Sequence, residues 1–279
     1  MSNEMINMLI EGFDPEKLEQ EEQQYDKAWK EIYGAYQNKT VIQGDFVAIE
    51  DLKTADDKNE TCAVVQIEDV RGYIPIKHFG VDNKRQLRAR VGERVAFVVL
   101  SYDRENNIFV GSRVQALEIM AEKFLNRVEV GDKVVAVVKN VTANQVRADV
   151  GGIEVKIPIE EIRYGWIDDL KKEIKKGDHI YVKVLEIDKE NKKVTVSRKA
   201  LQKNPFPDCL KRYPKGSEHV GTVSGVREYG VFVNLEDGVD SLARHLRYEN
   251  VKKGDRVVVR IISTDAKKEH IVTRITKIL

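Results

Sequence analysis

A sequence pattern that recurs after 85 residues constrains the fold of this chain more than any other feature. Residues 92–113 and residues 177–198 share eight identities in 22 positions, aligned in one register without a gap. A third, partial copy spans residues 254–265. The front ends repeat as well, and each opens a strand-like run at a glycine: Gly44, Gly131 and Gly216. Because repetition at a fixed period marks repeated structural units, the 279 residues are predicted to hold three copies of one module of about 75 to 85 residues.

The pattern within a module is that of β-strands. In the middle copy, short runs rich in β-branched residues alternate with Gly, Asn, Asp and Lys turns, and the runs span residues 134–138, 146–150, 153–157, 180–187 and 194–197. After the third run, residues 160–176 carry helix formers and an apolar spacing at Ile162, Trp166, Leu170 and Ile174. Five strands with such an insert predict a small Greek-key barrel, the OB-fold. The predicted fold class is all-β, with three tandem five-stranded OB barrels behind an N-terminal helix.

Segments outside the strands set the predicted domain boundaries. Asp14 and Pro15 begin a helix, and the chain is helical in composition from there to Gln37. Residues 113–126 form a second predicted helix, and the proline-rich run 204–207 interrupts the chain further on. We expect four segments: a helical segment at 1–40, a degenerate OB domain with a linker helix at 41–125, and OB domains at 126–205 and 206–279.

Charge is unevenly distributed, although the total is close to zero. The chain has 47 Lys plus Arg against 46 Asp plus Glu, a formal net charge of +1. By predicted segment, the net charge is −5 for residues 1–40, −2 for 41–125, and +4 for each of 126–205 and 206–279. The neutral total alone argues against nucleic acid, whereas the asymmetry permits it. We expect phosphate contacts in the basic half and a protein partner for the acidic half.

Composition and spacing argue against several other classes of protein. No stretch approaches the ~18 consecutive apolar residues of a membrane helix, and the N-terminus lacks the basic region of a secretory signal, so we expect a cytoplasmic protein without a membrane partner. Neither the two cysteines nor the five histidines show metal-site, disulfide or catalytic-triad spacing. The adjacent acids at 56–57 and 168–169 are expected to be solvated. We expect no enzyme, no cofactor and no metal.

Two aromatic residues of the third module are candidates for stacking on nucleic-acid bases. Tyr229 and Phe232 flank a glycine at a predicted strand start. Stacking of a base on an aromatic ring contributes ~1–3 kcal/mol and tolerates any sequence. Basic residues close in sequence are candidate phosphate ligands: Lys215, His219, Arg227, Arg244, His245 and Arg247. The alternative is that Phe232 is a core residue and Tyr229 a single surface ring.

The third module closely resembles the S1 domain, the RNA-binding OB module of the bacterial ribosomal protein S1 family. The resemblance lies in GTVSGVREYGVFVNLEDGVDSL, which begins at Gly221, and in the later GDRVVVRI. The second module resembles the family at its far end, in KKGDHIYVKVLEIDKENKKVTVSRKAL, and the first more weakly, in RGYIPIKHF and VGERVAFVVLSYDRENN. The match covers roughly residues 41–279. It implies a non-catalytic binder of single-stranded RNA that is connected with translation.

The resemblance also implies which residues face RNA: two aromatics, a histidine after the third strand, and an aspartate followed by a basic residue in the last hairpin. The third module has Arg244 at the histidine position, with His245 beside it, and Glu269 at the basic position. The second module lacks the aromatics, so its contacts are expected to be electrostatic or made by Tyr164 and Trp166. The first module looks least suited to RNA. The candidates are Tyr229, Phe232, Arg244, His245, His219, Arg227 and Asp265 in the third module, and Arg147, Asp188, Lys192, Tyr164 and Trp166 in the second.

Two features permit either a structural or a binding role. Trp166 is either a core residue of its own module or, if exposed beside Tyr164, an extra stacking platform. The N-terminal helix carries an apolar stripe that packs on its own barrel or enters a groove of a partner. The stripe consists of Tyr25, Trp29, Ile32 and Tyr36. The resemblance favours docking, because ribosomal protein S1 attaches to the small subunit through its N-terminal region.

The sequence therefore predicts a single-stranded RNA-binding protein associated with the ribosome or with translation. RNA, such as a messenger RNA, is expected to bind mainly to the two C-terminal OB domains, while the N-terminal half contacts the small ribosomal subunit or another protein. The alternative is a protein-interaction regulator of the transcription or translation machinery, or an accessory subunit of a ribonuclease, whose degenerate OB domains bind protein.

Overall fold

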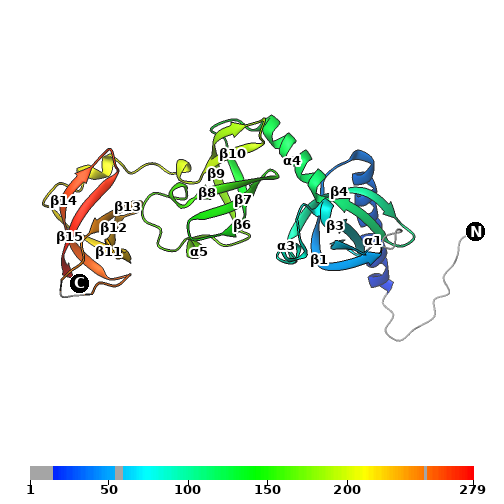
Figure 1. The fold of residues 1–279 in the computed structure, drawn as a ribbon, viewed down its shortest axis with the longest axis horizontal. Helices are drawn as coiled ribbons and strands as arrows, with labels where there is room; N and C mark the ends of the chain where they lie inside the picture. Colours follow the sequence, from blue (N-terminus) through cyan, green and yellow to red (C-terminus); the bar gives the residue numbers. More distant parts are fainter. Residues whose placement is uncertain (1–14, 54–58, 248–249) are drawn as a thin grey trace, which may run out of the picture. The chain divides into compact units, whose positions relative to one another are not determined.

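The chain is built mainly of strands, which form three five-stranded sheets one after another (Figure 1). The computed structural model describes residues 15–53, 59–247 and 250–279, and within them the side chains from residue 27 onward, apart from that of residue 53. The chain divides into two compact units, Met1–Lys123 and Phe124–Leu279. The first unit holds one sheet and the second unit holds two.

The first unit combines a long helix with a closed barrel. The helix is α1 (Pro15–Asn38), and the strands are β1 (Ile42–Lys53), β2 (Asn59–Ile67), β3 (Val70–Pro75), β4 (Arg94–Asp103) and β5 (Ile108–Ser112). Short helices α2 (Ile76–Phe79) and α3 (Lys84–Arg88) separate β3 from β4. The strand order is β1-β2-β3-β5-β4, with β3 and β5 parallel, and we call it the first barrel. Helix α4 (Arg113–Arg127) follows.

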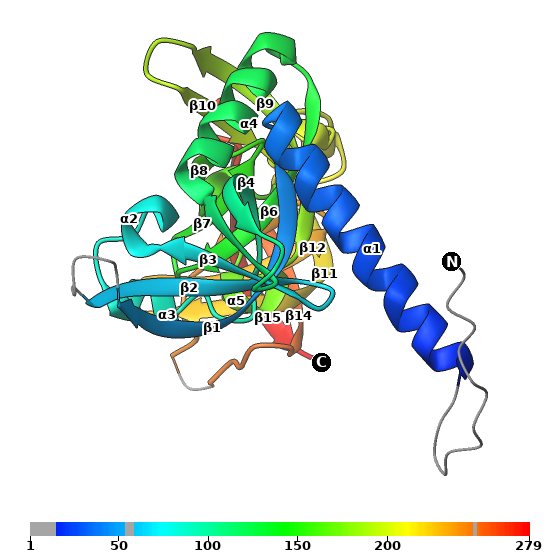
Figure 2. The same ribbon diagram turned by 90° about the vertical axis from the view of Figure 1, so that its right-hand side faces the viewer.

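Helix α1 packs on its own barrel, alongside β3 and β4 (Figure 2). Trp29 and Ile32 are 4% and 0% exposed and belong to the barrel core, and the Trp29 Nε1 donates a hydrogen bond to Asn107 at 3.0 Å. The docking prediction is therefore wrong for these two residues, because their apolar surface is already buried within the chain. Tyr36 is exposed, and Tyr25 lies outside the residues whose side chains are described.

The second unit begins with five strands close to those expected. They are β6 (Lys133–Val141), β7 (Gln145–Val150), β8 (Ile153–Pro158), β9 (His179–Asp188) and β10 (Lys193–Ser197), in the order β10-β9-β6-β7-β8. Strands β8 and β10, both fully described, lie next to each other without a hydrogen-bonded ladder. We call this near-closed sheet the second barrel.

The insert of the second barrel differs from the continuous helix that its composition suggests. It contains a single 3-10 turn (Ile159–Glu161) and a short helix, α5 (Leu170–Glu173). Gly165, in the left-handed region at φ +83°, lies in the irregular backbone between them. Ile162 and Leu170 are buried, as the apolar spacing predicts, but Trp166 is only partly buried. The residues between the two helical turns form a loop, residues 163–168, which we call the Trp166 loop.

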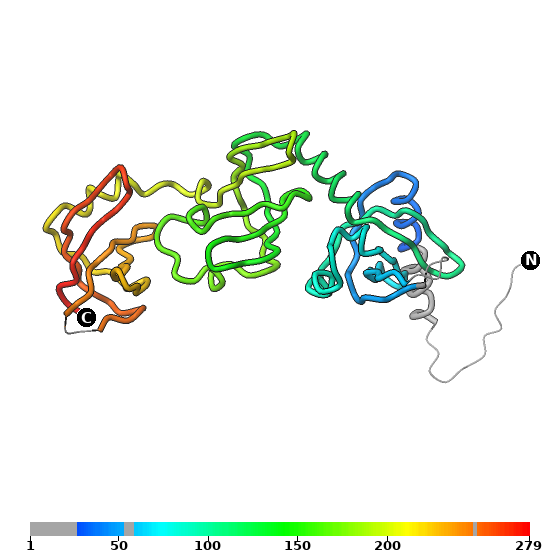
Figure 3. The backbone as a smooth tube through the Cα atoms, viewed as in Figure 1, coloured from blue at the N-terminus to red at the C-terminus, as the bar shows by residue number. Residues whose placement is uncertain are grey.

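A short 3-10 turn (Asp208–Lys211) precedes the third barrel. Its strands are β11 (Glu218–Arg227), β12 (Gly230–Glu236), β13 (Val239–Ala243), β14 (Arg256–Asp265) and β15 (His270–Ile278). The order β11-β12-β13-β15-β14 closes the barrel through a parallel β13–β15 pair, the same topology as the first barrel. Figure 3 traces the backbone of this barrel in orange to red. Its core is formed by inward-facing valines and isoleucines such as Val233, Val257 and Ile275. The predicted all-β fold of three tandem OB barrels behind a helix is confirmed.

Candidate nucleic-acid interface

Three aromatic side chains, Tyr229, Phe232 and Trp166, lie in a row on the surface of the third barrel, and we call them the ring row. Tyr229, just before β12, is 64% exposed and meets Phe232 edge-on, with ring centroids 5.9 Å apart. The other neighbour of Phe232 is Trp166 of the second barrel, stacked at 3.7 Å between centroids with only 8° between the planes. Phe232 is therefore neither a core residue nor a free surface ring, because the indole of Trp166 covers it.

A glycine of the third barrel makes this close approach possible. Gly225 on β11 lies opposite Phe232 on β12. A Cβ atom at Gly225 would lie 2.6 Å from the Trp166 Nε1 and 3.3 Å from an Asp168 side-chain oxygen, so any larger residue would push the Trp166 loop away. The loop and the strand are thus sterically matched.

The backbone of the Trp166 loop is held by an acid of the third barrel. The Trp166 N–H donates to the Asp240 carboxylate on β13 at 2.6 Å, and the Ser224 hydroxyl donates to the other oxygen of the same carboxylate at 2.8 Å. Gly165 is needed here as well, because a Cβ atom would lie 2.6 Å from that carboxylate. The hydrogen bond to Asp240 therefore holds the Trp166 loop against the surface of the third barrel.

Asp168 joins the same loop to two cations of the third barrel. Its carboxylate lies 2.7 Å from the Lys253 Nζ and 2.9 Å from an Arg227 guanidinium nitrogen. The hydrogen bond from Lys253 lowers the pKa of the Asp168 carboxyl below its ordinary value, and Arg227 acts in the same direction. The expectation that this acid is merely solvated is wrong, because it has two ion-pair partners. The Arg227 guanidinium also lies 5.5 Å from the centre of the Trp166 ring.

On its own side, the Trp166 loop is held by Arg163. The guanidinium donates to the carbonyl oxygens of Tyr164 and Trp166 at 3.2 and 2.8 Å, and to the Glu173 carboxylate of α5 at 2.9 to 3.2 Å. The hydrogen bond with Glu173 raises the pKa of Arg163 above its ordinary value. The second barrel therefore presents the loop in a defined conformation.

One donor in this contact has no acceptor. The Trp166 Nε1 is buried and has no hydrogen-bond partner among the described residues. A buried donor without a partner costs about 1–3 kcal/mol relative to the same group in water. The contact between the Trp166 loop and the third barrel is therefore well packed, but the unpaired Nε1 donor lowers its stability.

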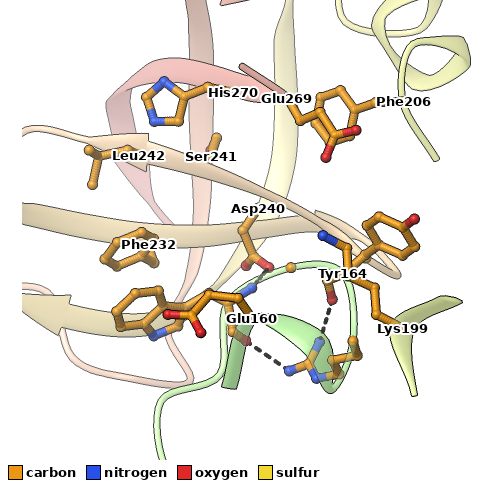
Figure 4. A pocket seen from close by; sticks show the side chains of 14 residues that line it. Glu160, Tyr164, Lys199, Phe206, Phe232, Asp240, Ser241, Leu242, Glu269 and His270 are labelled. Atoms are coloured by element: carbon orange, nitrogen blue, oxygen red, sulfur yellow. Dashed lines mark hydrogen bonds between the residues drawn. The ribbon is translucent and has the colours of Figure 1, made fainter. Parts of the chain in front are cut away.

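A cavity of about 280 Å³ opens beside the rings (Figure 4). Phe232, Asp240 and His270 line it from the third barrel, while Tyr164 and Lys199 line it from the second. The Lys199 ammonium lies 4.4 Å from the centre of the Tyr164 ring. Tyr164 thus lies next to the ring row, where a further ring for base stacking would be expected. The Lys199 ammonium occupies one face of its ring.

The structure separates the other basic candidates of the third barrel. The His245 Nε2 lies 2.7 Å from the carbonyl oxygen of Arg227, whose guanidinium faces Trp166, so His245 lies close to the ring row. Arg244, the residue before it, is exposed. His219 instead packs edge-on against Tyr213, 4.9 Å between ring centroids, and contacts Ser217. These two contacts of His219 lie outside the ring row.

The hairpin candidates have structural roles in turns. The Asp265 carboxylate accepts hydrogen bonds from the backbone N–H groups of Lys267 and Lys268 at 2.9 and 3.0 Å. Asp188 accepts from the backbone and side chain of Asn191, which lowers the pKa of the Asp188 carboxyl. Both acids therefore cap the turn between the last two strands of their barrels.

The remaining candidates lie on strand β7 and in the β9–β10 turn of the second barrel. Arg147 on β7 is half-exposed and forms a 3.5 Å ion pair with Glu154 on β8. Lys192 is exposed in the β9–β10 turn. These residues form no part of the ring row, and their RNA contacts stay a prediction.

Sequence reasoning missed four polar partners of the interface: Ser224, Asp240, Lys253 and Arg163. Ser224 and Asp240 lie within the run that resembles the S1 domain, but their role depends on a loop about 60 to 75 residues earlier in the chain. Spacing along a single strand cannot reveal such a partner.

No cluster of three or more His, Cys, Asp or Glu side chains in the described ranges could hold a metal ion. In that part of the chain, no helix has the length and apolar character needed to cross a membrane.

Comparison with known proteins identifies one module directly. Residues 127–199 match the S1 RNA binding domain family. This segment covers the second barrel, so the predicted resemblance to S1 domains is confirmed.

Relatives match almost the whole chain. Small ribosomal subunit protein bS1 of Coxiella burnetii is 28% identical over 281 residues, 96% of this chain and 49% of its own length. The bS1 protein of Pseudomonas aeruginosa is 26% identical over 95% of this chain and 48% of its own length. A 4-hydroxy-3-methylbut-2-enyl diphosphate reductase of Clostridium acetobutylicum is 29% identical over 91% of this chain but 40% of its own. The chain thus spans half the length or less of these curated relatives.

Proposed function

We propose, from the premise that this chain is built of S1-type domains, that it is a non-catalytic single-stranded RNA-binding protein associated with translation. RNA binds mainly to the second unit, Phe124–Leu279. The observation that carries the proposal is the pair of rings Tyr229 and Phe232, bordered by cations, in the unit whose other barrel matches an RNA-binding family.

The surroundings of the ring row suit a polyanion with planar bases. Tyr229 offers an exposed ring on which a base stacks without sequence preference. Arg227 lies two residues before Tyr229, His245 contacts the Arg227 carbonyl oxygen, and Arg244 directly precedes His245, so these residues supply positive charge for phosphates. A net charge of +4 in each of 126–205 and 206–279 supports the same assignment.

Substitution of two rings tests the proposal. We expect the double variant Tyr229→Ala, Phe232→Ala to bind a fluorescein-labelled oligouridine at least about tenfold more weakly, because each stacked ring contributes ~1–3 kcal/mol. Fluorescence anisotropy measures the affinity, and circular dichroism checks the fold. Tyr33→Ala, which removes a 46% exposed ring from the first unit, is the matched control. Wild-type affinity in the double variant would refute the stacking assignment.

Salt dependence separates this proposal from the protein-binding alternative. Binding that neutralises phosphates releases counterions, so the logarithm of the affinity falls linearly with the logarithm of the salt concentration, with a slope of about −0.7 per phosphate for single strands. An apolar protein interface lacks this slope. A flat salt profile with oligouridine would favour the regulator or ribonuclease-subunit alternative.

An exposed aromatic cluster favours an additional protein contact in the first unit. Tyr33, Tyr36 and Tyr102 are each more than one-third exposed, and both tyrosines of α1 meet Tyr102 edge-on. Rings of this kind serve as anchors at protein interfaces. The cluster supports docking of this unit to the small ribosomal subunit through Tyr36. Co-sedimentation with small subunits should be lost in Tyr36→Ala, and retention at wild-type levels would exclude this role.

A further inference from the structure

We propose that the Trp166 loop occupies a nucleotide-binding site of the third barrel, and that single-stranded RNA must displace the loop to bind there. The inference rests on the proposed RNA-binding function and adds to it a defined site and an internal competitor. It is carried by three positions at which the loop takes the place of a nucleotide group.

The first position is that of a base. The Trp166 indole lies 3.7 Å from Phe232 with an interplanar angle of 8°, which is the arrangement of a flat base stacked on an aromatic side chain. Tyr229 stands edge-on to Phe232, so it does not take the place of the stacked group. One face of Phe232 accepts one planar group, and the indole and a base exclude each other.

The second position is that of a phosphate. Two residues after the indole, the Asp168 carboxylate lies between the Lys253 ammonium at 2.7 Å and the Arg227 guanidinium at 2.9 Å. Two cations that converge on one anionic group suit a phosphate oxygen equally well, since charge-assisted hydrogen bonds form to either. Arg227 also faces the indole, so the cations border the ring site directly.

The third position is that of a hydrogen-bond donor on the base. The Asp240 carboxylate accepts the Trp166 backbone N–H at 2.6 Å. Exocyclic amino groups and ring N–H groups of bases are donors of the same kind. The loop therefore supplies a planar ring, a donor and an anion within three residues, which is the set of groups that one nucleotide presents.

Two further features favour release of the Trp166 loop from the third barrel. The Trp166 Nε1 is buried without a partner among the described residues, so it gains a hydrogen bond to water when the loop leaves. The indole contributes nothing to the core of its own barrel, in contrast to the neighbouring Ile162 and Leu170, which are buried there. Loss of the contact therefore leaves the second barrel intact.

Removal of the competitor is the first test. Full-length Trp166→Ala is titrated into fluorescein-labelled oligouridine, and we expect affinity to rise about tenfold over wild type, within the range of one stacked ring. Tyr33→Ala, an exposed ring of the first unit, should leave affinity unchanged. Unchanged or weaker binding by Trp166→Ala would overturn the inference, as would an equal gain in Tyr33→Ala.

A charge-matched pair tests the phosphate position. Asp168→Asn removes the carboxylate that Lys253 and Arg227 bind, whereas Asp169→Asn removes an equal charge one residue later. Asp169 caps α5 by accepting from the Lys171 N–H, and asparagine is an equally good cap. We expect a several-fold gain in affinity for Asp168→Asn alone. Equal gains in both variants would mean general electrostatics and would refute the phosphate position.

Intrinsic tryptophan fluorescence reports displacement of the loop in the wild-type chain itself. The chain has two tryptophans, Trp29 and Trp166, so the Trp166→Ala variant reports Trp29 alone. Oligouridine should shift the wild-type emission to longer wavelength, as the indole enters water, and should leave the variant's emission unchanged. A wild-type spectrum that does not shift at saturation would overturn displacement.

The outcomes distinguish this inference from the proposed function. If Phe232→Ala weakens RNA binding and Trp166→Ala fails to strengthen it, the RNA-binding function stands and the competitor is refuted. If neither wild type nor Trp166→Ala binds oligouridine, both are refuted.

Discussion

At the scale of single residues, the repeated hairpin shows why certain positions recur. The aspartate before the turn caps it in each barrel, at Asp103, Asp188 and Asp265. The residue four positions later has a left-handed backbone in each, with φ of 56° at Asn107 and 51° at both Lys192 and Glu269. The recurrence of these positions is thus explained by turn geometry, and an RNA contact at Asp188, Lys192 or Asp265 would be additional to it.

Lys192 offers a direct test of this backbone requirement. Because a non-glycine residue is strained at positive φ, Lys192→Gly should raise the free energy of unfolding by about 0.5 to 1 kcal/mol, as measured by urea denaturation. The next residue, Lys193, begins strand β10, so Lys193→Gly should lower it by a similar amount. Destabilisation by Lys192→Gly would contradict the turn assignment. A simultaneous loss of RNA affinity would support the predicted contact of this lysine.

At the scale of elements, the strands followed from the sequence but the insert did not. Runs of β-branched residues predicted β6 to β10 to within a few residues, because alternation along a strand is a local property. The apolar spacing of the insert placed Trp166 with Ile162 and Leu170, and the last two are indeed buried. Trp166 departs from them because its partner, Phe232, lies 66 residues away in another barrel, which no local period encodes.

The ion pairs of Asp168 predict how the Trp166 loop responds to acid. A pKa lowered in the docked state means that docking is stabilised above the ordinary carboxyl pKa of about 4 and loses that stabilisation as pH falls through the lower, docked value. As pH falls from 7 to below the ordinary carboxyl pKa of about 4, wild-type Trp166 emission should move to longer wavelength. The Asp168→Asn variant should lack the transition that is due to this carboxyl. Identical pH profiles would show that the ion pairs do not hold the loop.

At the scale of the whole molecule, the two compact units have separate cores. Trp29 and Phe97 belong to the core of the first, whereas Val233 and Val257 belong to a core in the second. The repeat predicted three barrels, and the topology agrees. The inclusion of two barrels in one unit could not be predicted, because the repeat does not encode the contacts of the Trp166 loop with the third barrel.

Thermal unfolding tests this division. In the Trp166→Ala variant, Trp29 is the remaining tryptophan and senses the core of the first unit. We expect its emission to report one cooperative transition, and we expect calorimetry of the wild-type chain to show a second, separate heat absorption from residues 124–279. A single transition with coincident midpoints in both measurements would mean that the two units unfold as one.

The tether between the Trp166 loop and its site has a consequence for which RNAs are bound. A competitor on the same chain is present at a fixed effective concentration, in the millimolar range for short connections, and cannot be diluted away. A mononucleotide has one ring and one phosphate, so it makes no more contacts at the site than the loop does. Its affinity is therefore low. A longer strand that also reaches Tyr229 and the basic surface of both barrels gains further contacts that the loop cannot match. The stacked tryptophan thus turns a nonspecific surface into one that discriminates by strand length.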